Sequence, residues 1–384
     1  MKKNHRRITA LLLGLLLIVL CATPARATQQ ETQYELLQSM TTVAFSGKLR
    51  ASGANPDDTQ DYVETTEEMA ERLRQGLKNR ETEIVIPIVT TRNDMGLVYE
   101  VMYAALAHTG DPTEGDYLSW HLGKMKLGHG VQIRVDDLWY YPLIYCPEYY
   151  TTAQQEAQLD LAVDTLLDQL DVYDAGDYEK VCAIYDYICK NVTYDYEGLA
   201  AGSNLIYTAY AALINGTAVC QGYANLFYRL ALELDVDARL IPGIGNGEDH
   251  GWNIVKLDGK YYNLDATWDA NYAQAGRAYK YFLRSQDNFP DHTRDGEYST
   301  EAFHSAYPMG AGDYVPATGP VPGDIDGDRK VARADVIRLL LHVTLPDRYP
   351  ITANADFNGD NGVTRADVIL LLLHVTLPDR YPLT

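Results

Sequence analysis

The sequence predicts an α+β fold, and three observations support this prediction. Apolar residues recur at helical spacing after Cys220, which indicates a helix that begins at that cysteine. Two strand-like runs, 252–257 and 260–264, flank Asp258-Gly259, which is a strong two-residue hairpin signal. The segment 321–384 contains two copies of an acidic loop followed by an apolar helical pattern, which predicts a small all-α tail.

Composition divides the 384 residues into five predicted segments. The fourth segment is rich in Gly, Pro and Ala, which is typical of a linker. The predicted segments are a signal peptide at 1–27, a mixed α/β flanking region at 28–176, a core at 177–309, a linker at 310–320 and the tail at 321–384.

The first segment has the composition of a secretory signal peptide. It has a basic beginning, an apolar run at 11–20 and an A-x-A cleavage site at Ala25-Arg26-Ala27. The apolar run is too short to span a bilayer. Leu20 is larger than the small residue that precedes a lipid-modified cysteine, which disfavours lipidation of Cys21. We expect a secreted, extracellular bacterial protein.

The charge of the remaining chain is strongly acidic. Of the 32 Lys and Arg residues, five lie in the signal segment, which has no acidic residue. The rest therefore carries 27 basic and 53 acidic residues, a formal net charge of −26. Such a surface disfavours nucleic acid and anionic lipid as partners and is compatible with cation binding.

The flanking region is predicted to contain helices and strands but no chemistry. Thr65 and Glu68 fit a capping box before a helix that runs through Leu77. The run 84–89 reads as a strand, and Pro87 makes it an edge strand. Further predicted elements are a helix at 97–107, strands at 131–135 and 138–146, and a helix capped by Thr152 and Gln155 that runs to Leu170.

Four cysteines follow the signal segment: Cys146, Cys182, Cys189 and Cys220. A helix is predicted at 177–191, and two of these cysteines lie on it seven residues apart. That spacing is a rise of about 10 Å, too far for a mutual disulfide. Either of them could pair with Cys146, and the sequence does not choose. No zinc-ligand spacing is present.

Cys220 has the position of an activated thiol. A helix N-terminus carries partial positive charge and unpaired N–H groups, and both favour the nucleophilic thiolate. Gly222 in the first turn costs helix stability, which is tolerable where another backbone or a substrate must approach closely.

The predicted hairpin brings a base and a carboxylate to the same sheet face. With Asp258-Gly259 as the turn, Trp252 faces Asp265, and His250 lies diagonally opposite Asp265 at about 7–8 Å between Cα atoms. One imidazole nitrogen can then contact the carboxylate while the other faces Cys220.

The oxyanion-stabilising group is less well defined by the sequence. Tyr194, Tyr207 and Tyr210 precede the nucleophile, and only the backbone N–H of Cys220 is assigned to this role. The run 279–284 is expected to continue as a strand. Two interpretations of His292 stay open, a place in the cleft together with Asp291 or the more common surface position.

The same residues resemble a known family. AVCQGYA at 218–224, DHGWN at 249–253 and NLDATW at 263–268 are similar to the core of the transglutaminase-like superfamily of papain-fold thiol enzymes. The resemblance covers about 178–269. It implies a papain-like core without a cofactor, with Cys220 as nucleophile, His250 as base and acid, and Asp265 as orienting residue. Family members include protein crosslinkers, deamidases, peptidases and inert binding domains, so the acyl acceptor is not fixed.

The tail repeats at an offset of 32 residues, and each copy opens with a pattern of alternating oxygen ligands. Such a loop, closed by a carboxylate at its twelfth position, suits a calcium ion, which takes six to eight oxygens. The predicted ligands are Asp324, Asp326, Asp328, the Lys330 carbonyl and Asp335 in one copy, and Asp356, Asn358, Asp360, the Gly362 carbonyl and Asp367 in the other.

The tandem at 321–384 resembles a type I dockerin, a module that binds a cohesin domain of a scaffolding protein. The resemblance implies two calcium ions and places Arg333, Ala334, Arg365 and Ala366 where dockerins set partner choice. The loops close with Asp instead of the Glu of a helix–loop–helix sensor, and Arg329 replaces the usual loop glycine, which weakens the first site. So short a segment with so little core should need its metal to fold.

Three functions are compatible with these features. The first is a secreted, scaffold-attached peptidase or amidase that cleaves peptide or glutamine amide bonds through an acyl-enzyme. The second is a transglutaminase that crosslinks proteins by transfer to an amine. The third is a non-catalytic binding module, accessory to a cellulosome-like polysaccharide-degrading complex.

Overall fold

The computed structural model describes residues 34–36, 62–316, 321–327, 331–351, 355–378 and 380–383. The chain divides into two compact units, Met1–Thr109 with Thr113–Ala153, and Gly110–Pro112 with Gln154–Thr384. The signal peptide predicted at 1–27 lies outside the described residues. Within these ranges, no helix has the length and apolar character needed to cross a membrane.

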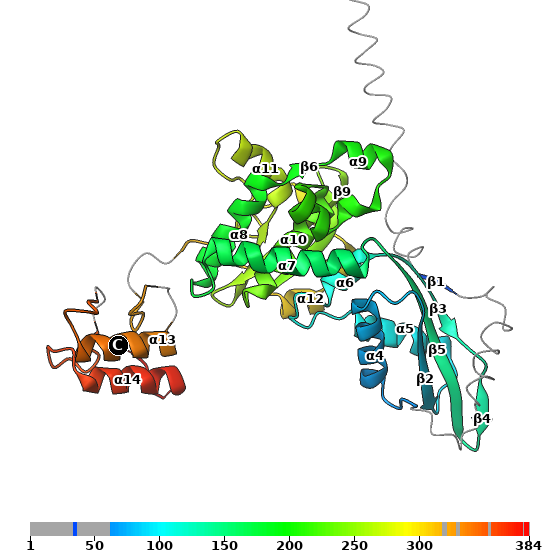
Figure 1. Ribbon diagram of the computed structural model, residues 1–384, viewed down its shortest axis with the longest axis horizontal. Helices are drawn as coiled ribbons and strands as arrows, with labels where there is room; N and C mark the ends of the chain where they lie inside the picture. The colour runs from blue at the N-terminus through cyan, green and yellow to red at the C-terminus, as the bar shows by residue number, and fades with distance from the viewer. Residues whose placement is uncertain are drawn as a thin grey trace, which may run out of the picture. The chain divides into compact units, whose positions relative to one another are not determined.

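The first unit is a five-stranded sheet with helices packed on it (Figure 1). The strand order is β1-β3-β5-β2, and β4 pairs with β5. Only β1 and β3 run parallel. The elements are β1 Tyr34–Leu36, α4 Thr66–Lys78, β2 Ile84–Thr90, α5 Met95–Ala105, α6 Asp116–His121, β3 Leu122–His129, β4 Ile133–Val135 and β5 Leu138–Tyr149.

For this unit, the edge position of β2 is confirmed, and of the predicted capping box the half made by the Thr65 side chain is confirmed. The Thr65 hydroxyl accepts the backbone N–H of Glu68 at 3.2 Å and so caps α4. Strand β2, which contains Pro87, stands at the end of the strand order, as expected for a strand with a proline. Strand β3 is not predicted by the sequence, because its glycines and lysines are weak strand formers and it depends on its pairing with β5.

The second unit contains a four-stranded antiparallel sheet in the order β10-β9-β8-β11. The strands β6 and β7 form a separate, short parallel sheet of their own. The elements up to the central helix are α7 Ala153–Leu170, α8 Asp177–Asn191, β6 Thr193–Tyr194, α9 Tyr196–Ala201, η1 Asn204–Tyr207, η2 Ala211–Asn215, β7 Thr217–Ala218 and α10 Cys220–Glu233. The later elements are β8 Ala238–Gly245, β9 Glu248–Leu257, β10 Lys260–Leu264, α11 Ala266–Gln274, β11 His292–Arg294, η3 Gly296–Ser299 and α12 Glu301–Ala306.

Helix α10 is the central helix of this unit. It begins at Cys220, as the apolar spacing predicted, and every residue from Gln221 to Leu232 is buried. It contacts α8, β8 and β9. A helix that is buried on all sides belongs to a core and not to a surface, so its first residue has a fixed position.

The β9–β10 hairpin has the predicted register. Leu257 pairs with Lys260, and Asn253 pairs with Leu264. Asp258 and Gly259 both have positive φ values, 49° and 76°, as the central residues of a type I′ turn require.

The strand predicted at 279–284 is wrong. Apart from one bridge between Asn263 and Arg284, this segment is irregular. The carboxylate of Asp269 accepts the backbone N–H groups of Lys280 and Tyr281 at 2.8 and 2.9 Å, and these donors are therefore lost to a strand ladder. Leu283, with a φ of 52°, also interrupts the extended conformation.

All four described cysteines are free thiols, so neither pairing considered for Cys146 is present. The beginning of the predicted linker is hydrogen bonded to the preceding residues. Gly310 donates its N–H to the carbonyl of Tyr261, and Tyr314 donates its N–H to the carbonyl of Leu283. The tail itself has two helices, α13 Arg333–Thr344 and α14 Arg365–Thr376, around a small apolar cluster that includes Leu339 and Leu371.

The fold predicts that Gly222 cannot be replaced without a loss of stability. A Cβ at this position would lie 2.7 Å from the carbonyl oxygen of Ile206 and 3.1 Å from that of Thr208. Because both contacts are with backbone, we expect Gly222→Ala to lower the free energy of unfolding by about 1–3 kcal/mol. Urea denaturation measures this change. The control Gly296→Ala, where the added Cβ meets open space, should change it by less than about 0.5 kcal/mol. Equal losses in the two variants would contradict the expectation.

Candidate active site

Cys220 is placed by two elements that meet at the start of α10. Strands β6 and β7 run parallel, with Tyr194 beside Ala218, and β7 leads through Val219 into the helix. The cysteine is partly exposed, in contrast to the buried residues that follow it. Its sulfur is therefore accessible and lies at the positive end of the helix dipole.

His250 projects from β9 into a space that Gly245 leaves open. It pairs with Gly243 of β8. A Cβ on Gly245 would lie within 2.9–3.0 Å of three carbons of the His250 side chain. The imidazole stacks on two indole rings, with centroids 5.0 Å from Trp268 and 6.2 Å from Trp252. These contacts fix the plane of the imidazole.

Asp265 directly follows β10 and is the N-cap of α11. Its Oδ1 accepts the backbone N–H groups of Thr267 at 2.9 Å and Trp268 at 3.2 Å. Its Oδ2 accepts the Nε2–H of His250 at 2.8 Å. The diagonal contact expected from the hairpin register is therefore present, and the helix start fixes the orientation of the carboxylate.

The third contact joins His250 to Cys220. The side chain of Cys220 lies close enough to the imidazole to help raise the pKa of His250. Since Nε2 of His250 faces Asp265, the other ring nitrogen, Nδ1, is the one left for the sulfur. The three residues predicted to carry the chemistry are thus brought together.

The electrostatics of this group favour an ion pair. Burial acts to lower the pKa of His250, but Asp265 and Cys220 outweigh it and raise the pKa to about 10. Burial acts to raise the pKa of Asp265, but His250 and His292 hold it well below its usual range. At neutral pH Asp265 is therefore ionised and His250 is an imidazolium, the partner that stabilises a cysteine thiolate.

His292 also belongs to this group, so its interpretation as a surface residue is wrong. It lies in β11 and is buried, and its Nε2 is 3.2 Å from Oδ2 of Asp265. Strand β11 pairs with β8, which is distant in sequence, and the short run 292–294 has no apolar alternation to reveal it. The combined ligand atoms of His250, Asp265 and His292 lie within 4.8 Å of one another. The N···O separations are those of hydrogen bonds, so we assign hydrogen bonds and not a metal.

Of the three tyrosines considered for oxyanion stabilisation, the structure distinguishes Tyr194 from Tyr210. The hydroxyl of Tyr210 donates to Oε1 of Gln158 at 3.0 Å, so it is engaged elsewhere. Tyr194 lies beside Ala218 in the β6–β7 pair. Burial and the nearby Cys220 raise the pKa of Tyr194 well above its usual value, so its hydroxyl keeps its proton and can donate it in a hydrogen bond. The structure therefore favours Tyr194.

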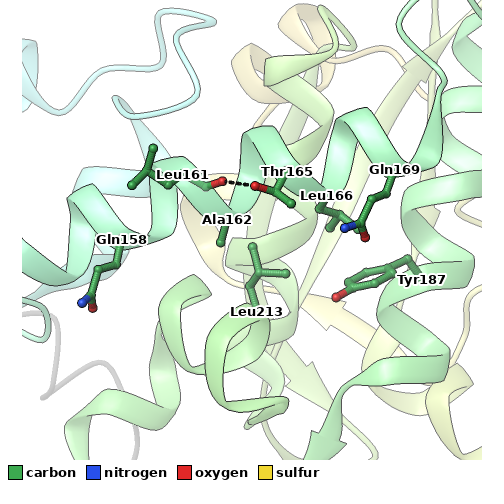
Figure 2. A pocket seen from close by; sticks show the side chains of 8 residues that line it. All are labelled: Gln158, Leu161, Ala162, Thr165, Leu166, Gln169, Tyr187 and Leu213. Carbon is green, nitrogen blue, oxygen red and sulfur yellow. Dashed lines mark hydrogen bonds between the residues drawn. The ribbon is translucent and has the colours of Figure 1, made fainter.

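A separate surface pocket lies between α7, α8 and η2 (Figure 2). Its volume is about 440 Å³. It is lined by Gln158, Leu161, Ala162, Thr165, Leu166, Gln169, Tyr187 and Leu213. None of the residues that surround Cys220 lines this pocket, so it is not part of the candidate active site.

In the tail, the carboxylates predicted as metal ligands converge. Ligand atoms of Asp324, Asp326 and Asp335 lie within 4.8 Å of one another. Asp335 is buried and accepts the N–H groups of Ile325 and Asp326 at 2.7 and 3.2 Å. Asp328 and Lys330 lie outside the described residues. A set of three carboxylates is the donor chemistry that calcium prefers, so the residues fit this ion.

The second loop has the same local construction. Asp367 is buried at the equivalent position and accepts the N–H groups of Phe357 and Asn358 at 2.8 and 3.2 Å. Asp356 accepts those of Gly359, Asp360 and Asn361. Gly362 follows in the same loop, where its N–H donates to Asp360.

The residues predicted to set partner choice are exposed. Arg333 and Ala334 begin α13, and Arg365 and Ala366 begin α14. Large apolar side chains at equivalent places of the two helices are exposed as well; they are Ile337, Leu340, Ile369 and Leu372.

Comparison with known proteins agrees with the geometry of the core. Residues 164–266 match the family model of the transglutaminase-like superfamily, and this range includes Cys220, His250 and Asp265. Kyphoscoliosis peptidase of Mus musculus is 28% identical over 129 residues, which are 30% of this chain and 20% of that protein. The Homo sapiens protein of the same name is 26% identical over 156 residues, which are 38% of this chain and 23% of that protein. The chain therefore spans only about a fifth of the length of these curated relatives.

Among solved structures, one titled "Crystal structure of a TGase" is 16% identical, with 48% of this chain and 51% of that chain covered. Its TM-score of 0.28 is too low to establish a common fold. The family match and the two sequence relatives lead to a limited conclusion. This chain contains a transglutaminase-like domain, and the Cys220, His250 and Asp265 cluster lies within it.

Proposed function

We propose that this protein is a thiol enzyme that hydrolyses peptide or glutamine amide bonds. The observation that carries the proposal is the contact chain from Cys220 through His250 to Asp265, with an N···O distance of 2.8 Å at its second link. The transglutaminase-like domain supports thiol chemistry. The peptidase name of the two relatives supports hydrolysis as the outcome.

In the proposed mechanism, the Cys220 thiolate attacks the carbonyl carbon of the scissile amide. The oxyanion that forms accepts hydrogen bonds from the Cys220 backbone N–H and the Tyr194 hydroxyl. The His250 imidazolium then gives its proton to the leaving amine as the C–N bond breaks, which leaves a thioester. His250, now neutral, takes a proton from water, which attacks the thioester and releases the acid. Asp265 stays ionised throughout and holds the imidazole in place.

The nearest alternative differs only in the group that attacks the thioester. If a primary amine outcompetes water, the product is a crosslinked protein, the outcome expected of a transglutaminase. A glutamine-containing substrate incubated with a labelled primary amine distinguishes the two. Free acid supports the proposed hydrolysis, and incorporation of the label into the substrate supports transfer.

Enzymatic function requires a reactive Cys220. Because His250 is charged at neutral pH, we expect this thiol to react with iodoacetamide about tenfold or more faster than a model thiol near neutral pH. Cys220→Ser should abolish amide cleavage. The control Cys182→Ser should leave both the cleavage and the fast alkylation unchanged, because burial raises the pKa of the Cys182 thiol.

A rate of Cys220 alkylation no higher than that of a model thiol would argue for the non-catalytic alternative. In that case the transglutaminase-like domain would be a binding module. Mass spectrometry of the alkylated peptides assigns the reacting cysteine in each variant.

The role of Tyr194 is tested by removing its hydroxyl alone. We expect Tyr194→Phe to lower kcat by about 100-fold with little change in KM, since an oxyanion donor acts mainly in the transition state. Tyr210→Phe is the matched control, because that hydroxyl donates to Gln158. If the Tyr194→Phe variant has the kcat of the unmodified enzyme, Tyr194 does not stabilise the oxyanion, and the Cys220 backbone N–H remains as the assigned donor.

For the tail, we propose a type I dockerin that binds two calcium ions and a cohesin domain of a scaffolding protein. The convergence of Asp324, Asp326 and Asp335 supports the first calcium site, and the matching loop around Asp367 supports the second. The exposed side chains at the beginnings of α13 and α14 are available to a partner. Together with the predicted signal peptide, this proposal implies a protein outside the cell, on a free or cell-surface cellulosome-like assembly.

Calcium binding by the tail should depend on specific carboxylates and not on total charge. We expect Asp324→Asn to weaken calcium binding at least about tenfold, because it removes one ligand charge while keeping an oxygen that can accept the Gly327 N–H. Asp347→Asn removes the same charge from an exposed position outside the loops and should have no effect. Isothermal titration calorimetry measures both. A chelator should also unfold the tail and abolish capture by a cohesin, and capture that persists in excess chelator would refute the proposal.

A further inference from the structure

The Asp265 carboxylate has two imidazole donors on one oxygen. Oδ2 is 2.8 Å from Nε2 of His250 and 3.2 Å from Nε2 of His292. Oδ1 accepts the two backbone N–H groups at the start of α11. A carboxylate has about four acceptor sites, so these four donors fill them. His292 thus occupies one of the four acceptor sites of the Asp265 carboxylate, although it has no role in the proposed mechanism.

The contact fixes the protonation state of His292. An ionised carboxylate only accepts hydrogen bonds, so Nε2 of His292 must carry the proton and Nδ1 must be the unprotonated nitrogen. Nδ1 is buried, and none of the residues that the structure describes gives it a hydrogen-bond partner. A second proton there would be a buried donor without an acceptor, next to the charged His250. Burial accordingly lowers the pKa of His292 despite the adjacent Asp265, and the ring stays neutral.

The surroundings leave the His292 ring no other polar partner. Its side chain is 0% exposed, and its ring centroid lies 3.8 Å from Phe289 and 4.4 Å from Trp268. The titratable groups that face it are Asp265, His250, Asp291 and Tyr281. Arg294, two residues along β11, donates to Oδ1 of Asn263 instead.

We propose that His292 is a positioning residue of the reaction, which shares Oδ2 of Asp265 with His250 and so limits how strongly that carboxylate holds the imidazolium. The inference rests on the proposed thiol chemistry for its effect on turnover. Its effect on the protonation of His250 does not depend on any turnover.

The direction of the effect follows from the charge on Oδ2. A second N–H donor stabilises the negative charge of this oxygen and reduces its basicity towards His250. Without that donor, the carboxylate stabilises the imidazolium more strongly, and the pKa of His250 rises. An imidazolium with a higher pKa gives up its proton less readily, so transfer to the leaving amine becomes slower.

The experiment compares three variants of the full chain with the unmodified protein. His292→Phe keeps an aromatic ring but has no N–H, His292→Gln keeps a neutral N–H donor, and Phe289→Leu changes the packing against the ring without touching its donor. Imidazole NMR titration gives the pKa of His250. The pH dependence of Cys220 alkylation gives the highest pH at which the pair of Cys220 thiolate and His250 imidazolium persists. Turnover of an amide substrate gives kcat and KM.

For His292→Phe we expect the pKa of His250 to rise by about one pH unit. The upper pH limit of the ion pair, measured by alkylation of Cys220, should rise by the same amount. We also expect kcat to fall by about tenfold at unchanged KM, the lower end of the effect of losing one hydrogen bond to a charged group. In His292→Gln, the pKa of His250 and kcat should both return most of the way to the values of the unmodified protein. Phe289→Leu should leave the pKa of His250 unchanged. An unchanged pKa in His292→Phe, or equal changes in all three variants, would overturn the inference.

A measurement on the unmodified protein keeps the inference testable if His292→Phe does not fold. Nitrogen chemical shifts should show His292 as the neutral tautomer with its proton on Nε2, and a proton on Nδ1 would overturn the inference. The two proposals also fail separately. An unreactive Cys220 with a raised His250 pKa in His292→Phe refutes only the proposed function, whereas an active enzyme with no such change refutes only the role of His292.

Discussion

The arrangement of the candidate active site depends on one carboxylate, that of Asp265. It directly follows β10, caps α11 through Oδ1 and accepts the imidazole N–H of His250 through Oδ2. A cap satisfies N–H groups that a helix start otherwise leaves unpaired, so the helix holds the carboxylate while the carboxylate holds the helix. The orientation of the His250 imidazole is thereby tied to a folding requirement, and the Asp265 side chain cannot rotate away without the loss of both interactions.

The position of Cys220 depends also on close packing. Helix α10 is buried along almost its full length, and Gly222 lets its first turn lie against the carbonyls of Ile206 and Thr208. Gly245 has a corresponding role opposite His250, where a side chain would collide with the imidazole. Two glycines therefore allow the close packing next to Cys220 and His250.

Local signals were sufficient to predict much of this site. The Asp258-Gly259 turn determined the hairpin register, and the register placed His250 diagonal to Asp265. The start of α10 at Cys220 followed from apolar spacing. His292 could not be found in this way, because β11 gains its place only through pairing with β8, and a three-residue strand has no periodicity. The segment 279–284 has the composition of a strand, but the side chain of Asp269 takes two of its N–H groups. In both cases a contact between residues distant in sequence decided the outcome.

The stacking of His250 on Trp252 and Trp268 also gives the protein an optical property. Two of its four tryptophans lie against the ring whose charge state matters most for the proposed chemistry. An indole face interacts more strongly with a cation than with a neutral ring, so gain or loss of the imidazole proton changes the surroundings of both chromophores. The intrinsic fluorescence of the folded chain is thus coupled to the ionisation of its own centre, without any added label.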